Sequence, residues 1–327
     1  MKVLVTGAGG YIGTTLTRLL LENDHKVVAL DRFHFGDDLL PKHKNLKSVK
    51  GDIRNVSISI FEGIDAVIDL AAISNDPAGE LNPTTTISIN HLGRLRMASL
   101  AKSSGVKRYI LPSSASVYGF SDKISNEESD TNPLTTYAEA NLLAEKDILS
   151  LSDSTFIVTV LRQSTVFGLS HRMRFDLAIN GMTKGFLTKG KIPILKDGSQ
   201  WRPFIHVRDT CKAMIAVLLS ESGKVQGQIF NVGCNHQNYQ ILDVARQVAE
   251  AANLPFEYEW YGDPDHRSYR LDFSKIKNII DFSPDFNAKH GAKEVADAIR
   301  ENKVNVDDPK TITLVWYKKL INDGVKI

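Results

Sequence analysis

A glycine-rich turn near the N-terminus constrains the fold more than any other feature of this sequence. The segment Thr6-Gly7-Ala8-Gly9-Gly10-Tyr11-Ile12-Gly13 follows a short apolar run and opens a segment of helical period. Gly7, Gly10 and Gly13 meet three needs: a tight turn, close approach of backbone to a phosphate, and close packing of helix on strand. The start of the helix then offers free N–H groups and a positive dipole to an anion. We expect this turn to hold a dinucleotide pyrophosphate; the competing interpretation is a structural turn without a ligand.

Short apolar runs alternate with longer segments of helical period over the first half of the chain. The expected strands are Val3–Thr6, Lys26–Leu30, Ala66–Leu70, Arg108–Leu111 and Phe156–Leu161. The expected helices are Ile12–Glu22, Ile87–Ser103 and Ala138–Ser150. Strand–helix alternation with apolar strands predicts an α/β fold with a doubly wound parallel sheet.

After Gly168 this rhythm becomes irregular, although strands and helices return. The later candidates are Ile192–Leu195, Phe204–Leu219, Ile229–Val232, Ile241–Ala252 and Val295–Ile299. No repeat or obvious linker separates them from the first half, so interleaved lobes are expected. We assign residues 1–168 and 203–234 to a dinucleotide-binding domain. Residues 169–202 and 235–327 are assigned to a smaller α/β substrate lobe.

The amino-acid composition narrows the binding partners and the cellular compartment that we expect for this protein. The net charge is +2 and no long run of like charges occurs, so nothing favours nucleic acid as a partner. Two cysteines are too few for a disulfide framework and favour a reducing cytoplasm. No apolar stretch reaches membrane-spanning length. We see no metal-binding pattern.

Acidic residues after the second and third strands favour NAD as the dinucleotide. Asp31 follows Gly13 by 18 residues, where a carboxylate accepts hydrogen bonds from ribose hydroxyls and repels a 2′-phosphate. Arg32 comes next and leaves occasional use of NADP open. Asp52, followed by Ile53, is expected to reach the adenine. A turn or capping role is the alternative for both carboxylates.

The chain resembles the extended short-chain dehydrogenase/reductase family, specifically its NAD-dependent sugar-nucleotide epimerases, dehydratases and reductases. The resemblance runs to about Lys275. It rests on the glycine turn, Leu70-Ala71-Ala72, Ser113-Ser114-Ala115-Ser116-Val117-Tyr118-Gly119, Tyr137, Arg202-Pro203-Phe204-Ile205-His206-Val207 and Arg267-Ser268-Tyr269-Arg270-Leu271-Asp272. It implies a Rossmann domain, a sugar-nucleotide lobe and a homodimer built on two long helices. It also places Tyr11, Ile12, Leu70, Ala71 and Ala72 in the cofactor site.

The resemblance further implies hydride transfer between a sugar carbon and the nicotinamide. Tyr137 matches the tyrosine that moves the hydroxyl proton, and Ser114 matches the hydroxyl residue beside it. The family motif continues with a lysine four residues after the tyrosine, where this chain has Asn141. That lysine holds the nicotinamide ribose and lowers the tyrosine pKa. Asn141 can still bond a ribose hydroxyl but carries no charge, so Tyr137 is expected to be mainly protonated at neutral pH.

Three interpretations of this departure stay open. The enzyme chiefly reduces a keto sugar, another base acts, or redox activity has been lost. Dehydration is disfavoured, because Ala115 and Ser116 stand where family dehydratases carry an acid pair. Epimerisation through a transient 4-keto sugar and net reduction of such a sugar remain.

Several polar residues are candidates for holding a nucleotide-diphosphate sugar. The resemblance gives Arg202 and Arg267 to the diphosphate, a task suited to a planar charged fork. Asn75 and Ser116 are expected near the sugar, although Asn75 and Asp76 are equally suited to capping a turn. Arg174 follows the sixth strand, together with His171 and Arg172. These residues either contact the substrate or form a solvated basic loop.

A different class of protein also fits: a dinucleotide or nucleotide-sugar sensor whose tyrosine is idle. The missing lysine favours it. The presence of Tyr137, Ser114 and both diphosphate arginines argues against it, because a sensor needs none of them.

Overall fold

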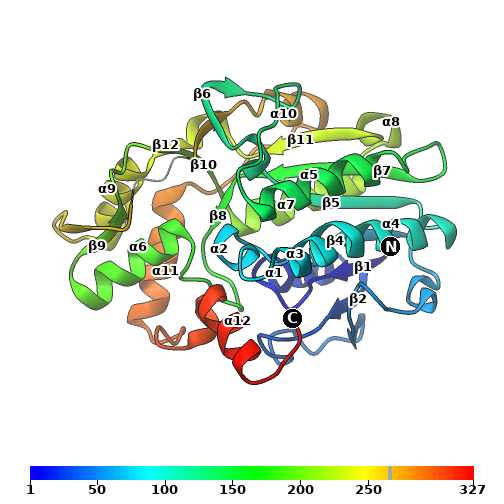
Figure 1. Cartoon of the computed structure of the whole chain (residues 1–327), viewed down its shortest axis with the longest axis horizontal. Coiled ribbons are helices and arrows are strands. Elements are labelled where there is room, and N and C mark those ends of the chain that lie inside the picture. The colour runs from blue at the N-terminus through cyan, green and yellow to red at the C-terminus, as the bar shows by residue number, and fades with distance from the viewer. Residues whose placement is uncertain (264–266) are drawn as a thin grey trace.

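A seven-stranded parallel sheet forms the centre of the protein (Figure 1). The computed structural model describes residues 1–263 and 267–327. In spatial order the strands are β3 (Leu46–Lys50), β2 (Lys26–Asp31), β1 (Lys2–Thr6), β4 (Ala66–Asp69), β5 (Arg108–Ser114), β7 (Ile157–Gln163) and β11 (Gln228–Val232). The order reverses between β1 and β4, which places a topological switch point beside the glycine turn. The predicted doubly wound α/β fold is confirmed.

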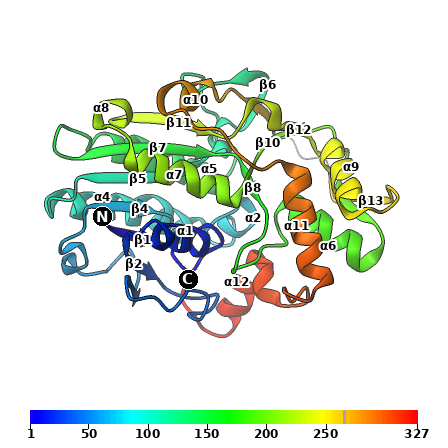
Figure 2. The same cartoon turned by 180° about the vertical axis from the view of Figure 1, so that it is seen from behind.

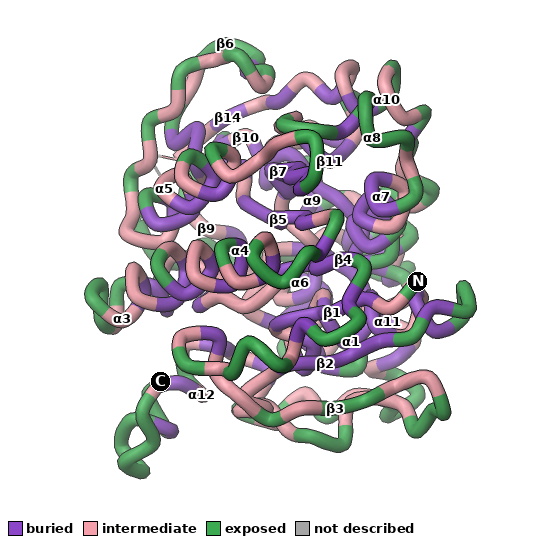
Figure 3. The backbone as a smooth tube through the Cα atoms, turned by 90° about the vertical axis from the view of Figure 1, so that its right-hand side faces the viewer, coloured by how far each residue is buried: buried purple, intermediate pink, exposed green. Residues whose placement is uncertain are grey.

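Helices cover both faces of this sheet, which is why its inner strands are apolar throughout. The covering helices are α1 (Tyr11–Glu22), α7 (Val207–Leu219), α4 (Arg94–Ser103) and α5 (Thr136–Leu149). Val3 and Val5 of β1 join one buried cluster with α1 and α7, while Leu4 joins a second cluster with α4 and α5. Figure 2 shows α1 and α7 in front of the sheet, and Figure 3 shows the buried residues gathered on the central strands.

The helix predicted over 87–103 is broken into three pieces. They are α3 (Pro83–Ile87), a π-helical turn η2 (Ser88–Gly93) and α4. Within the π-turn, the buried Asn90 accepts a hydrogen bond from Ile73 N at 2.8 Å and donates one to Ile73 O at 3.0 Å. The turn therefore fixes the loop that follows β4, a contact that the apolar period does not reveal.

The smaller lobe has its own core. Its strands form three small sheets: β8 (Thr165–Phe167), β10 (Trp201–His206) and β12 (Asn238–Gln240); β9 (Ile192–Leu195) and β13 (Tyr258–Tyr261); β6 (Phe120–Ser125) and β14 (Ser268–Leu271). Its long helices are α6 (Ala178–Lys189), α9 (Ile241–Ala252) and α11 (Ala288–Arg300). Buried apolar residues of these helices pack together with β9 and β10. Strand β10 pairs with β8 and β12 in one of these small sheets, while the following helix α7 covers the large sheet.

The last helix, α12 (Thr313–Asn322), returns to the first domain. Its Tyr317 and Leu320 are buried in the same cluster as Leu4 of β1. Figure 1 shows this red helix beside the blue strands, although they lie at opposite ends of the sequence.

The remaining short elements connect these units. They are η1 (Ile58–Phe61), α2 (Asp76–Gly79), η3 (Ala115–Tyr118), α8 (Ser222–Val225), η4 (Asn235–Gln237), α10 (Ser274–Ile280) and η5 (Pro309–Thr311). Within the described ranges, no helix combines the length and apolar character needed to cross a membrane.

Candidate active site

The glycine turn has the geometry that its sequence predicts. Gly7 has a φ of +63°, and a Cβ there would lie 2.6 Å from the carbonyl carbon of Leu70. A Cβ on Gly13 would lie 2.1 Å from the carbonyl oxygen of Gly7. Gly10 caps α1 in an extended conformation. These contacts bring the turn against β4 and direct the start of α1 toward the open edge of the sheet, where an anion fits.

Asp31 ties this turn to the end of β2. Its carboxylate accepts hydrogen bonds from Gly9 N at 2.9 Å and Phe33 N at 2.6 Å. Burial raises the pKa of Asp31, and these backbone donors oppose that rise. The two backbone hydrogen bonds therefore hold the Asp31 carboxylate in one position beside the glycine turn.

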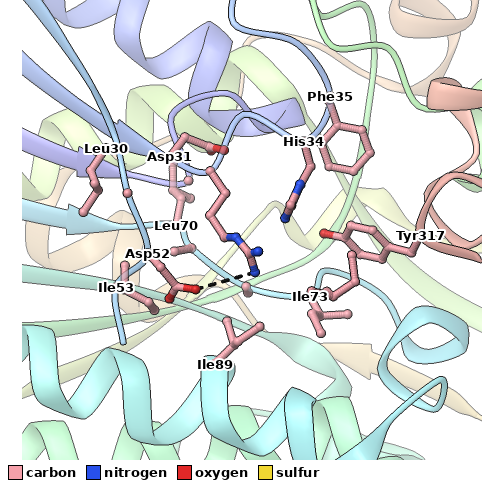
Figure 4. A pocket seen from close by; sticks show the side chains of 16 residues that line it. Leu30, Asp31, His34, Phe35, Asp52, Ile53, Leu70, Ile73, Ile89 and Tyr317 are labelled. Atoms are coloured by element: carbon pink, nitrogen blue, oxygen red, sulfur yellow. Dashed lines mark ion pairs between the residues drawn. The ribbon is translucent and has the colours of Figure 1, made fainter. Parts of the chain in front are cut away.

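A pocket opens between the turn and the ends of β2, β3 and β4, and we call it the glycine-turn pocket (Figure 4). Its lining includes eight of the predicted cofactor residues: Gly7, Asp31, Arg32, Asp52, Ile53, Leu70, Ala71 and Ala72. A groove of backbone, carboxylates and apolar side chains suits the adenosine half of a dinucleotide.

Arg32 and Asp52 form an ion pair across the glycine-turn pocket, 3.5 Å from Nη1 to Oδ2 (Figure 4). Asp52 also accepts hydrogen bonds from Arg54, the shortest 2.6 Å from Nη2. Burial alone would raise the pKa of Asp52, but the hydrogen bonds and charge of Arg54 outweigh it and lower that pKa. Asp52 is thus held ionised by the two arginines.

Six residues predicted to bind the cofactor lie outside the lining of this pocket: Gly10, Tyr11, Ile12, Gly13, Tyr137 and Asn141. The Tyr11 hydroxyl donates to Gly168 O at 2.6 Å and accepts from Asn180 Nδ2 at 3.2 Å. The Tyr11 side chain therefore joins α1 to the segment that leads into the smaller lobe. Only the backbone of Tyr11 is left to take part in the glycine turn.

Tyr137 and Ser114 meet at the C-terminal edge of the sheet. Ser114 ends β5, and Tyr137 lies in the first turn of α5, whose N-cap is Thr135. Burial raises the pKa of Tyr137, and a hydrogen bond with Ser114 opposes that rise. Ser116 donates to Ser114 Oγ at 2.9 Å, so three hydroxyl groups lie in sequence here.

Asn141 lies one turn further along α5 and bonds to two neighbours. Its Nδ2 donates to Tyr137 O at 2.9 Å, and its Oδ1 accepts from Arg94 Nη1 at 3.0 Å. Arg94 was not among the residues expected from the sequence. The expected helix 87–103 holds two arginines, Arg94 and Arg96, and only the fold shows that Arg94 is the buried one.

Charged side chains from other elements surround Tyr137. Arg267 forms an ion pair with Asp76, which also accepts a hydrogen bond from Thr135 at 2.5 Å. Arg174 bonds both carboxylate oxygens of Asp176 at 2.9 Å.

Asn75 joins the same group through Asp176. Its Nδ2 donates to Asp176 Oδ2 at 2.8 Å, while its Oδ1 caps α2 by accepting from Ala78 N at 2.9 Å. The two roles considered for Asn75, capping and a place beside the site, therefore coexist. Arg172 faces elsewhere and lies 3.7 Å over the Phe35 ring.

A second pocket lies in the smaller lobe, and we call it the lobe pocket. It is lined by Thr165, Phe175, Asp176, Leu177, Ala178, Gly181, Met182, Pro193, Leu195, Gln200, Arg202, Phe204, Ile241, Tyr261 and Arg267. Both arginines expected to bind a diphosphate are present, and Arg202 lies 5.1 Å over the ring of Tyr269. The Arg267–Asp76 pair links this pocket to the surroundings of Tyr137.

Sequence reasoning missed part of both pockets. In the glycine-turn pocket the missed residues are Leu30, His34, Phe35, Gly51, Ile73, Ile89, Tyr317 and Ile327. Trp316 of α12 donates to His34 O at 2.7 Å, and the Tyr317 ring lies 5.6 Å from that of Phe35. These contacts join segments almost 300 residues apart, so no local pattern signals them.

The fold and this site define a dinucleotide-binding enzyme class: a Rossmann-like sheet with a glycine turn, and a tyrosine–serine pair beside a second pocket. The family model described as the NAD dependent epimerase/dehydratase family matches residues 3–233. The chain belongs to this family, which confirms the predicted resemblance and the prediction of NAD as cofactor.

Individual relatives match over nearly the whole chain. An uncharacterised UDP-glucose epimerase of Bacillus subtilis (strain 168) is 30% identical, over 89% of this chain and 95% of its own. A UDP-glucose 4-epimerase of Lactobacillus helveticus is 29% identical, over 97% of each chain. The solved structure of MoeE5 in complex with UDP-glucuronic acid and NAD is 26% identical with a TM-score of 0.83, over 92% of this chain and 100% of that one.

Proposed function

We propose that this protein is an NAD-dependent 4-epimerase of UDP-linked sugars. The observation that carries the proposal is the Tyr137–Ser114 pair, which meets where β5 ends and α5 begins, at the C-terminal edge of the sheet. Relatives named as UDP-glucose epimerases over nearly the full chain favour the same activity. Bound NAD would supply the reversible hydride acceptor that the chemistry requires.

The protein's own residues then have distinct tasks. Tyr137 exchanges a proton with the sugar hydroxyl, and Ser114 shares a hydrogen bond with the same oxygen. Asn141 is proposed to bond the nicotinamide ribose. The glycine turn, Asp31 and Asp52 would hold the pyrophosphate and adenosine, because Gly7 and both carboxylates line the glycine-turn pocket.

The lobe pocket is proposed to take the nucleotide and its diphosphate. Arg202 and Arg267 offer planar charged forks to the phosphates. Asn75, Arg174 and Ser116 are the polar groups proposed to contact the sugar, since they lie around the tyrosine. On this basis we propose a dinucleotide domain and a substrate lobe, with helix α12 counted with the dinucleotide domain and not, as the sequence assignment had it, with the lobe.

Net reduction of a keto sugar is the second candidate, and the raised pKa of Tyr137 favours it. A phenol at neutral pH is a ready proton donor but a weak base. Dehydration stays disfavoured, because Ala115 and Ser116 supply no carboxylate. The sensor interpretation has less support, because the relatives described above are named as epimerases.

The test is incubation of the purified protein with UDP-glucose and with UDP-glucuronic acid, followed by proton NMR of the sugar. We expect C4 epimers to form without net production or use of NADH. The Tyr137→Phe variant is expected to lose at least ~100-fold in rate while it still binds NADH. The control is Tyr258→Phe, which alters an exposed tyrosine of β13.

Steady NADH consumption with a keto-sugar substrate would instead establish the reductase. Binding of NADH and UDP-sugars with no turnover of any sugar would establish the sensor. Either result contradicts the epimerase.

We also propose a homodimer formed through α4 and α5. These helices contact each other on one side of the sheet, and Leu92 in the preceding π-turn is exposed. Light scattering of the purified protein, with Leu92→Asp as the disrupting variant, tests this assembly.

A reducing cytoplasm remains the proposed location. Cys211 and Cys234 are both free thiols, and Cys211 is buried beneath α1. Fractionation of cells that produce the protein would test the location.

A further inference from the structure

An arginine lies buried beneath the Tyr137 site and joins three elements there. Arg94, at the start of α4, is 1% exposed. Its Nη2 donates to Asp69 O at 2.8 Å and to Pro112 O at 2.5 Å, near the ends of β4 and β5. Its Nη1 donates to Asn141 Oδ1 at 3.0 Å. Burying a guanidinium is costly, so its partners must compensate for the lost water.

The bond from Arg94 fixes which way the Asn141 amide faces. Arginine has donors only, so the atom that faces it must be the amide oxygen. The amide nitrogen then donates one proton to the backbone carbonyl oxygen of Tyr137, one turn back along α5, at 2.9 Å. An amide nitrogen carries two protons, and the second is left for a hydroxyl acceptor.

The charge of Arg94 is only loosely paired. Its Nε lies 3.8 Å from Asp69 Oδ2 and, within the described residues, makes no hydrogen bond. The Asp69 carboxylate accepts instead from the hydroxyls of Thr6 and Tyr109. The bonded nitrogens of Arg94 donate to carbonyl and amide oxygens, so among the described residues its hydrogen bonds do not go to a carboxylate.

Four side chains from different elements act on Tyr137. They are Ser114 of β5, Asp76 of α2, Arg94 of α4 and Arg174 after β8. The charges of Arg94 and Arg174 lower the pKa of Tyr137, against burial and the carboxylate of Asp76. Arg174 is held by both oxygens of Asp176, whereas Arg94 lacks such a bidentate partner.

We propose that Arg94 is a positioning residue of this active site, which orients the Asn141 amide and places a buried positive charge next to helix α5, which carries Tyr137. This inference rests on the proposed function, because ionisation of Tyr137 matters only where that residue moves a proton. The two functions that a single lysine would combine are then divided between two helices. Arg94 of α4 supplies the charge, and Asn141 of α5 supplies the hydrogen-bond donor.

The first test measures the ionisation of residue 137 directly. Tyr137 is replaced by 3,5-difluorotyrosine, whose more acidic phenol titrates within the range where the protein is folded, and fluorine NMR follows the titration without added substrate. Arg94→Met removes the charge and is expected to raise the pKa at residue 137 by about one unit. Arg94→Lys keeps the charge and is expected to leave the pKa close to that of the parent.

The matched control is Arg108→Met. Arg108 also donates to two backbone carbonyls, those of Val217 and Ser220, but at the opposite end of β5. We expect no change in the pKa at residue 137. An unchanged pKa in Arg94→Met, or an equal shift in the control, would overturn the proposal.

The second test is rescue, read as the NADH dissociation constant. Arg94→Met is expected to weaken NADH binding about tenfold, the loss expected for one unsatisfied polar group. The double variant Arg94→Met, Asn141→Lys places a cation and a donor on α5 and is expected to recover most of that loss. Lysine at position 141 cannot restore the ties from Arg94 to β4 and β5, so recovery separates positioning from stabilisation of the fold.

A double variant that binds NADH no better than Arg94→Met would overturn the positioning role. Should Arg94→Met fail to fold, Arg94→Gln takes its place in both tests, because glutamine removes the charge but keeps an amide donor at this position. A wild-type protein that turns over no UDP-sugar would contradict the proposed function while the titration and NADH results still judge Arg94.

Discussion

At the scale of single residues, the protonation of Tyr137 governs what the site can do. Burial raises its pKa, and the Ser114 hydrogen bond and the two arginine charges do not fully cancel that rise. The ionised form therefore makes up a minor fraction at neutral pH. Proton donation to a ketone is favoured there, and proton removal from an alcohol becomes easier as pH rises.

This gives a pH prediction for the oxidative direction. Because the pKa of Tyr137 lies above its ordinary value of ~10, the rate of alcohol oxidation should rise with pH across the neutral and alkaline range, by up to ~tenfold per unit. The measurement is kcat/KM against pH for a UDP-sugar. A profile that is flat above pH ~7 would contradict this account of the base.

Gly13 gives a second prediction at this scale. In Gly13→Ala the new Cβ would meet the backbone of Gly7 and Ala8 within 2.1 and 2.7 Å, so α1 must move away from the turn. We expect a loss of ~1–3 kcal/mol in stability and little remaining NADH affinity. Gly223→Ala in α8 is the control, because a Cβ there meets nothing within 4 Å. Equal NADH affinity in the two variants would show that the close approach is unimportant.

The residues that sequence predicted well are those whose role is local. The glycine turn and Asp31 lie within one strand–turn–helix–strand unit, so spacing alone places them together. Arg94 and Asn141 lie on different helices and meet only because both helices cover the same face of the sheet. A pattern within either helix carries no information about that contact.

At the scale of elements, the π-turn η2 makes a contact with the loop after β4 that a regular helix would not make. It inserts Asn90 under the loop after β4, where its amide satisfies both backbone groups of Ile73. That loop carries Ala71 and Ala72 of the glycine-turn pocket. The spacing of apolar residues predicted a helix here but not the π-turn that interrupts it. The π-turn depends on its contact with the loop after β4, which lies in another part of the sequence.

The π-turn predicts a specific effect of Asn90→Ala. Two buried backbone groups would lose their partners, at a cost of ~1–3 kcal/mol, and the loop would loosen. We expect lower stability together with weaker NADH binding, measured by denaturant unfolding and by fluorescence titration. Asn82→Ala, which removes an exposed cap from α3, should lower stability modestly and leave NADH binding unchanged. Unaltered NADH binding in Asn90→Ala would separate the turn from the site.

At the scale of the whole molecule, α12 closes the glycine-turn pocket from the far end of the chain. Tyr317 is buried against Phe35 and lines the pocket, and Trp316 bonds His34 O (Figure 4). The chain order thus runs from the first domain through the lobe and back. Composition and periodicity predicted two lobes but could not predict this return, because it is a long-range packing event.

The return of α12 predicts that Tyr317→Ala weakens NADH binding by about tenfold, since it removes a ring from the pocket wall. Binding of UDP at the lobe pocket should be unaffected, because Tyr317 does not line it. Calorimetric titration of each ligand measures both effects. Tyr258→Ala serves as the control, and an equal loss for both ligands would point to general unfolding instead.

The Arg94–Asn141 bond also constrains how this sequence can change. A lysine at position 141 has no acceptor for Arg94, so that single substitution would leave one buried donor unpaired and set two cations side by side. If Arg94 were replaced before Asn141, the Asn141 amide would lose the hydrogen bond that orients it. Neither position can be exchanged alone at low cost, and the two are therefore expected to have been inherited together in the lineage that produced this protein.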